Sequence, residues 1–130
     1  MLDPNVIISG LLSRDGSPAR TLLAWRDGRF ELVLSPLLLG ELERALSYPK
    51  LRARITRQDA EAAIRWLSQS AAVADDPPEG PSLRSEDPGD DYLIALAAQD
   101  RAALVSGDKH LLALAGRIPV YSPREFVDLV

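Results

Sequence analysis

The 130-residue sequence contains no cysteine and only one histidine, His110. The lack of cysteine excludes a disulfide scaffold, a zinc–thiolate site and a cysteine nucleophile, and a single histidine excludes a histidine-rich metal site. No apolar run approaches the roughly 20 residues that span a bilayer. The start, Met1-Leu2-Asp3, lacks the basic and apolar regions of a signal peptide. We therefore expect a cytoplasmic protein without a membrane partner.

The overall composition is that of one ordinary globular domain. Hydrophobic residues make up 46% and charged residues 26% of the chain, and a chain of this length is expected to form a single domain over residues 1–130. The net charge of −4 argues against a general nucleic-acid coat protein. It is compatible with a metal-dependent nuclease, because there the ions supply positive charge at the reacting phosphate.

Helix starts are marked by an N-cap oxygen followed by proline. The marked pairs are Ser17-Pro18, Ser35-Pro36, Asp87-Pro88 and Ser122-Pro123. They predict helices at about 18–28, 36–47, 88–100 and 123–129. The spacing of Ala60, Ala63, Ile64 and Leu67 predicts another helix at about 57–69, and a short helix should follow Asp108.

Short apolar runs between these helices predict strands at 30–34, 102–106 and 118–121, with a weaker one at 71–73. The first segment is open to two interpretations, because Val6, Ile7 and Ile8 favour a strand whereas Ile8, Leu11 and Leu12 fit one helical face. A third possibility is a strand that ends near Asp3 before a helix begins. Residues 75–89 read as a long surface loop. The alternation predicts an α/β fold, a three-layer α/β/α arrangement around a central, mainly parallel sheet.

Several acidic residues fall where these elements should meet. They are Asp3, Glu41, Asp90, Asp91 and Asp108. Each lies in or beside an apolar run, where an isolated carboxylate is costly to bury. In open α/β sheets, sites form beyond the carboxyl ends of the strands, so one crevice could hold these side chains. Oxygen ligands without cysteine indicate a hard cation such as Mg²⁺ or Mn²⁺.

The motifs that carry these acids occur in an order that resembles a known family. They are Leu2-Asp3-Pro4-Asn5-Val6 with Ser9, Ser35-Pro36 leading to Glu41-Leu42, Asp87-Pro88-Gly89-Asp90-Asp91 with Ile94-Ala95, Val105-Ser106-Gly107-Asp108-Lys109, and Ser122-Pro123-Arg124-Glu125-Phe126. Together they resemble the PIN-domain nucleases, and in particular the VapC-like toxins of bacterial toxin–antitoxin pairs.

The resemblance implies a PIN-like fold and a Mg²⁺- or Mn²⁺-dependent ribonuclease that hydrolyses RNA phosphodiester bonds. By motif, the catalytic and metal-binding quartet would be Asp3, Glu41, Asp90 and Asp108, and the supporting residues would be Asn5, Asp91 and Ser106. The resemblance also implies an RNA substrate, a small antitoxin protein as partner and a homodimer.

Other interpretations stay open. Pro4 stands where the family usually has threonine, which leaves the alternative of a catalytically weak or inactive PIN-fold module that acts through protein or RNA binding. A phosphotransfer enzyme or a receiver domain fits less well. Asp3-Pro4-Asn5 does not match the Asp-x-Asp pattern that dehalogenase-type phosphatases have after the first strand, and the chain does not meet the receiver pattern of a mid-chain acceptor aspartate after the third strand and a later lysine.

Outside the acidic set, a basic stretch and some aromatic residues allow further expectations. Lys50, Arg52, Arg54 and Arg57 could contact RNA phosphates or form a solvated stretch. Trp25, Trp66 and Tyr92 are expected to pack rather than to stack on bases.

Overall fold

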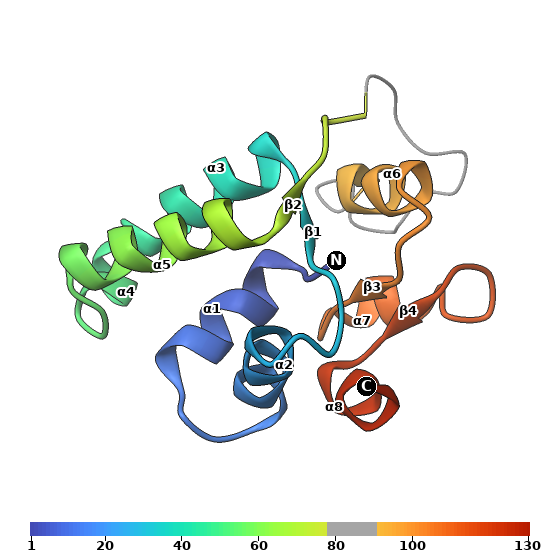
Figure 1. The fold of residues 1–130 in the computed structure, drawn as a ribbon, viewed down its shortest axis with the longest axis horizontal. Coiled ribbons are helices and arrows are strands. Elements are labelled where there is room, and N and C mark those ends of the chain that lie inside the picture. Colours follow the sequence, from blue (N-terminus) through green and yellow to red (C-terminus); the bar gives the residue numbers. More distant parts are fainter. Residues whose placement is uncertain (78–90) are drawn as a thin grey trace.

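The computed structural model describes residues 1–77 and 91–130, and its α/β architecture is rich in helices with short parallel strands (Figure 1). The elements are α1 (Pro4–Leu12), α2 (Ser17–Arg26), β1 (Val33–Leu34), α3 (Pro36–Leu46), α4 (Pro49–Arg52), α5 (Arg57–Ser70), β2 (Ala72–Val73), α6 (Asp91–Gln99), β3 (Leu104–Val105), α7 (Lys109–Leu112), β4 (Val120–Tyr121) and α8 (Pro123–Leu129).

The strands form two separate parallel pairs in the described part of the chain. Strand β1 pairs with β2, and β3 pairs with β4. The expected strands were therefore placed correctly but are shorter, two residues each, and they do not join into one continuous ladder. The parallel character was predicted correctly, whereas the arrangement in three layers stays a prediction.

The first segment follows the interpretation of a strand that ends near Asp3 before a helix begins, and the strand expected at Val6, Ile7 and Ile8 is wrong because these residues lie in α1. Leu2 forms a parallel bridge with Val105, and the backbone N–H of Asp3 donates to the carbonyl of Val105 at 2.9 Å. Pro4 then opens α1, with Asp3 as its N-cap. Proline is accepted at this position because the first helical N–H has no partner within the helix. A strand stump thus ends at Asp3 beside β3.

Two of the expected helix caps are confirmed. The hydroxyl of Ser35 accepts the N–H of Leu38 at 3.2 Å, and Ser122 forms a complete capping box with Glu125. Ser17 is not an N-cap: α2 already includes it, and Gly16 precedes the helix with φ 100° and no side-chain cap. The Asp87-Pro88 start lies outside the described residues.

Helices α3, α4 and α5 form an arm that extends to the left of the ribbon view in Figure 1. Its inner face joins the hydrophobic core through Leu38, Leu42, Leu46, Ala60 and Leu67. The short helix α4 was not predicted, although Pro49 stands at its first turn. The arm also contacts α2, where Trp25 packs on Trp66 of α5 with 4.6 Å between ring centroids, as expected for packing residues.

None of the helices in residues 1–77 and 91–130 has the length and apolar character needed to cross a bilayer.

Candidate functional site

Asp3 is the most deeply buried acidic residue of the described chain, with 4% of its surface exposed. Its position is fixed by the bridge between Leu2 and β3 on one side and by the start of α1 on the other. One carboxylate oxygen, Oδ1, accepts the backbone N–H of Asn5 at 3.0 Å. The other, Oδ2, accepts the hydroxyl of Ser106 at 2.7 Å. Both oxygens are thus oriented by groups on two different elements.

The pKa of the Asp3 carboxyl is raised above its usual range, chiefly because burial removes water from the charged form. The nearby carboxylates of Asp108 and Glu41 raise this pKa further. The hydrogen bonds from Asn5 and Ser106 act in the opposite direction, because they stabilise the ionised form. A buried carboxylate whose pKa is raised by two neighbouring carboxylates is a candidate cation ligand.

Ser106 links Asp3 to Asp108. Its buried hydroxyl donates to Asp3 and accepts the backbone N–H of Asp108 at 3.0 Å. Asp108 follows β3 directly and caps α7, where its Oδ1 accepts the N–H of His110 at 2.8 Å. The sequence motif that placed Ser106 and Asp108 together is therefore a strand end followed by a helix start, and this strand forms the bridge with Leu2 that holds Asp3 nearby.

Glu41 reaches the same region from α3. Its Oε2 accepts the phenol O–H of Tyr92 at 2.6 Å. The half-buried Tyr92 belongs to α6, so this bond joins two helices across the site. Sequence reasoning assigned Tyr92 to packing alone and missed this hydrogen bond.

A cavity of about 250 Å³ opens at these groups. It is lined by Asp3, Pro4, Asn5, Ile8, Glu41, Arg44, Ala45, Tyr48, Tyr92 and Leu93. Two members of the expected quartet, Asp3 and Glu41, thus share one cavity, and Asp108 is close enough to Asp3 to influence its charge. Asp108 is not among the lining residues. Arg44 and Tyr48 were not expected at this site from the sequence.

The remaining expected site residues divide into three cases. Asp90 lies outside the described residues. Asp91 opens α6 and is half-buried, but it does not line the cavity. Asn5 lines the cavity and supports Asp3 through its backbone N–H, a contact that does not require an asparagine side chain.

A group of three acidic, histidine or cysteine side chains suited to one metal ion does not occur within residues 1–77 and 91–130. The donors that are described still suit a hard cation, because Asp3 and Glu41 offer carboxylate oxygens in one cavity. Asp90, the fourth acid of the expected quartet, lies outside these residues.

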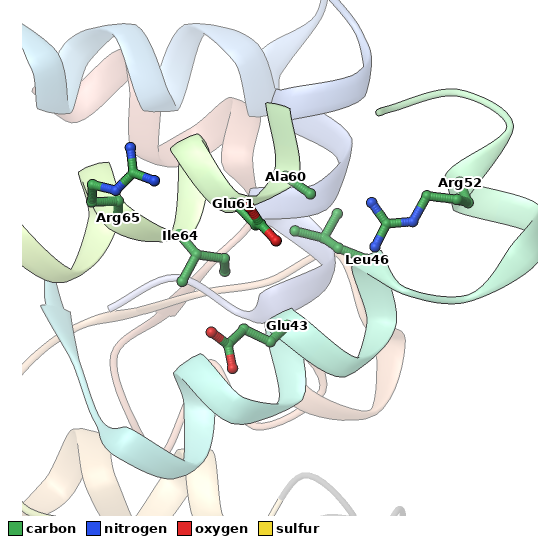
Figure 2. Close-up of a pocket in the computed structure, with 7 residues that line it drawn as sticks. All are labelled: Glu43, Leu46, Arg52, Ala60, Glu61, Ile64 and Arg65. Atoms are coloured by element: carbon green, nitrogen blue, oxygen red, sulfur yellow. The ribbon is translucent and has the colours of Figure 1, made fainter. Parts of the chain in front are cut away.

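The expected basic stretch lies on the arm, and none of its four residues is among those that line the acidic cavity. Arg52 lines a second cavity, of about 400 Å³, between α3, α4 and α5, and points from α4 toward Leu46 (Figure 2). Its Nη1 atom is buried without a hydrogen-bond partner. Arg57 pairs with Glu61 at 3.1 Å, and Arg54 donates to the carbonyl of Leu12. The contact of Lys50, Arg52, Arg54 and Arg57 with RNA stays a prediction.

Two comparisons with known proteins identify what this chain is similar to. The family model of the PIN domain matches residues 1–110. The chain is also similar to an uncharacterized protein of Methanocaldococcus jannaschii, with 27% identity over 139 residues that cover 98% of this chain and 88% of that protein.

The structure is an α/β domain with a buried Asp3 and two half-buried acids, Glu41 and Asp108, near the ends of its parallel strands, and acids in such a place are typical of metal-dependent enzymes. The match over residues 1–110 makes the assignment specific: this chain belongs to the PIN-domain family. The nuclease-type fold that the sequence resemblance implied is thereby confirmed.

Proposed function

We propose that this chain is a Mg²⁺- or Mn²⁺-dependent endoribonuclease, a hydrolase of RNA phosphodiester bonds. The observation that carries the proposal is the buried carboxylate of Asp3, which lies at a cavity with Glu41 and whose pKa is raised by burial and by Asp108 and Glu41. Carboxylates that lie close together repel one another, and a cation would offset this repulsion. RNA hydrolysis is a use for such a cation that agrees with membership of the PIN-domain family.

The residues proposed to hold the cation are Asp3, Glu41, Asp90 and Asp108. When bound, Mg²⁺ or Mn²⁺ would supply an activated water and charge neutralisation at the phosphate. The protein's own contribution is orientation. Ser106 and the N–H of Asn5 fix the two oxygens of Asp3, and Tyr92 fixes one oxygen of Glu41.

The test is cleavage of labelled single-stranded RNA by the purified protein. We expect cleavage with Mn²⁺ or Mg²⁺, none with a chelator, and a nearly complete loss in Asp3→Asn and Glu41→Gln. Glu43→Gln is the matched control, because Glu43 lies two residues further along α3 but lines the other cavity. Cleavage that survives Glu41→Gln as well as it survives Glu43→Gln would remove Glu41 from the reaction.

A second candidate function is a PIN-fold module that acts by binding and does not cleave. The observation in its favour is that no three potential metal ligands gather among the described residues. Folded protein that leaves several RNA pools intact in the presence of Mn²⁺ would support this second function over the first.

The wider setting is also a proposal. The protein would act in the cytoplasm as the toxin of a toxin–antitoxin pair, as a homodimer held inactive by a small antitoxin protein. A neighbouring reading frame for a small protein with a DNA-binding half would support this role. Co-purification of that protein, with loss of RNA cleavage in the complex, is the direct test.

A further inference from the structure

The acidic cavity has one wall that carries no acid beyond Glu41. Glu41, Arg44, Ala45 and Tyr48 line it, and they follow one another at the i, i+3, i+4, i+7 spacing of a single helical face. The face begins on α3 and continues just past its end, where the N–H of Tyr48 donates to the carbonyl of Ala45 at 3.2 Å. The side chains of Arg44 and Tyr48 therefore follow Glu41 along the cavity wall.

Arg44 is the only basic residue among the described residues that line this cavity. Its side chain is exposed, and the ion pairs found in residues 1–77 and 91–130 join other residues. Glu41, one turn away, accepts Tyr92 instead. A guanidinium that stays unpaired beside carboxylates is suited to a phosphate, because its planar N–H groups match phosphate oxygens.

Tyr48 presents an aromatic ring to solvent at the same wall. It is 54% exposed, whereas Trp25 is buried and Trp66 is half-buried against it. Its backbone holds it at the junction of α3 and α4, because its carbonyl accepts the N–H groups of Leu51 and Arg52. Exposed aromatic rings next to a phosphate-binding group are typical platforms for unpaired bases.

We infer that Arg44 and Tyr48 form a nucleotide-binding subsite for single-stranded RNA, in which Arg44 contacts a backbone phosphate and an unpaired base stacks on Tyr48. The inference rests on the proposed ribonuclease function and extends it, because it states which residues outside the acidic set select the substrate. A paired base cannot expose its face to Tyr48, so the subsite selects against duplex RNA.

The experiment measures binding by fluorescence anisotropy, with a labelled single-stranded RNA and a duplex of the same sequence. Binding is measured over a range of salt concentrations, with chelator and with Mn²⁺, and gels verify that the RNA is intact. Tyr48→Ala should weaken binding to single-stranded RNA about 5-fold to 100-fold and leave duplex binding unchanged. Tyr48→Phe keeps the ring and should bind as the parent does.

Arg44→Gln should weaken binding and reduce the salt dependence, with the slope of log K against log salt smaller by about 0.7, the value for one phosphate contact on a single strand. Arg65→Gln is the matched control. It removes the same charge from an exposed arginine on α5 that lines the other cavity (Figure 2), and it should leave the slope unchanged. Thermal melting of each variant verifies folding.

Two results would overturn the inference: parental affinity in both Tyr48→Ala and Arg44→Gln, or an equal loss of duplex binding in Tyr48→Ala. These outcomes are distinguishable from failure of the proposed function. Cleavage without any effect of the two substitutions removes the subsite and leaves the nuclease. Loss of binding in the variants of a protein that never cleaves RNA supports the subsite and removes the hydrolysis.

Discussion

The two parallel ladders in the described part of the chain each pair two strands of two residues, but they differ in their surroundings. In the ladder of Leu2, β3 and β4, the side chains of Leu2, Leu104 and Val105 are at most 1% exposed. In the ladder of β1 and β2, Leu34 is buried, whereas Ala72 is exposed and Val73 is 50% exposed. The first ladder is an interior element, and the second lies at the surface on one side.

This difference explains how each acid is held. Asp3 and Asp108 follow the strands of the interior ladder within three residues, so backbone hydrogen bonds such as that from Ser106 to the Tyr121 carbonyl, at 3.0 Å, fix their positions. Glu41 follows the surface ladder only by way of α3. It therefore depends on a side-chain bond from Tyr92 for its orientation. Backbone hydrogen bonds therefore position Asp3 and Asp108, whereas the phenol of Tyr92 orients Glu41.

The largest expected effect is the difference in unfolding free energy between a substitution in the interior ladder and one in the surface ladder. Leu104→Ala should lower the free energy of unfolding by about 2–5 kcal/mol, because it leaves a cavity in the interior. Val73→Ala should change it by less than about 0.5 kcal/mol, since half of that side chain is already in water. Urea denaturation of both variants measures the difference. Similar losses would show that the exposed ladder is covered in solution.

Tyr92→Phe tests the weaker half of the site. It removes the hydrogen bond to Glu41 and keeps the ring, so the unfolding free energy should fall by about 1 kcal/mol. Cleavage at saturating Mn²⁺ should fall about tenfold, because Glu41 loses its fixed orientation. Single-turnover rates, together with melting curves, measure the two effects. A variant that is less stable but cleaves at the parental rate would assign the bond to structure alone.

Asp3→Asn should change the free energy of unfolding by an amount similar to that of Tyr92→Phe, but with the opposite sign. In the presence of chelator it should raise the unfolding free energy by on the order of 1 kcal/mol, roughly 4 °C in Tm. The reason is that the amide has no charge to desolvate and can still accept from Asn5 and donate to Ser106. A lower Tm than the parent would show that the ionised carboxylate is stabilising.

The pH dependence of that gain follows from the raised pKa of Asp3. The unfolded carboxyl ionises near its ordinary pKa of 3.8, while the folded one retains its proton to higher pH. The parent therefore loses stability as pH rises from 3.8 through the folded pKa. The advantage of Asp3→Asn should be absent below pH 3.8 and complete above the folded pKa, as melting curves over pH would measure.

The sequence predicted those features that local chemistry determines. Ser35 and Ser122 were predicted as caps from an N-cap oxygen followed by proline, a pattern that failed at Ser17-Pro18 because α2 begins one residue earlier. Ser106 and Asp108 were placed together by one motif. The extent of the ladders was not predictable, since pairing depends on contacts between distant segments such as Leu2 and Val105. The bond between Tyr92 and Glu41 crosses 51 positions, and no local pattern indicates it. The Arg44 and Tyr48 wall did have a readable signal in its helical spacing from Glu41.

We propose that Asp3, Glu41, Asp90 and Asp108 serve one cation, and a calorimetric titration with Mn²⁺ tests this shared site. The parent and Glu43→Gln should bind Mn²⁺ alike, whereas Glu41→Gln and Asp108→Asn should each bind at least tenfold more weakly. Melting curves should agree: Mn²⁺ at a hundred times its Kd should stabilise the parent by about 2.7 kcal/mol and have little effect on Asp108→Asn. Equal Mn²⁺ affinity in all four proteins would contradict a shared site.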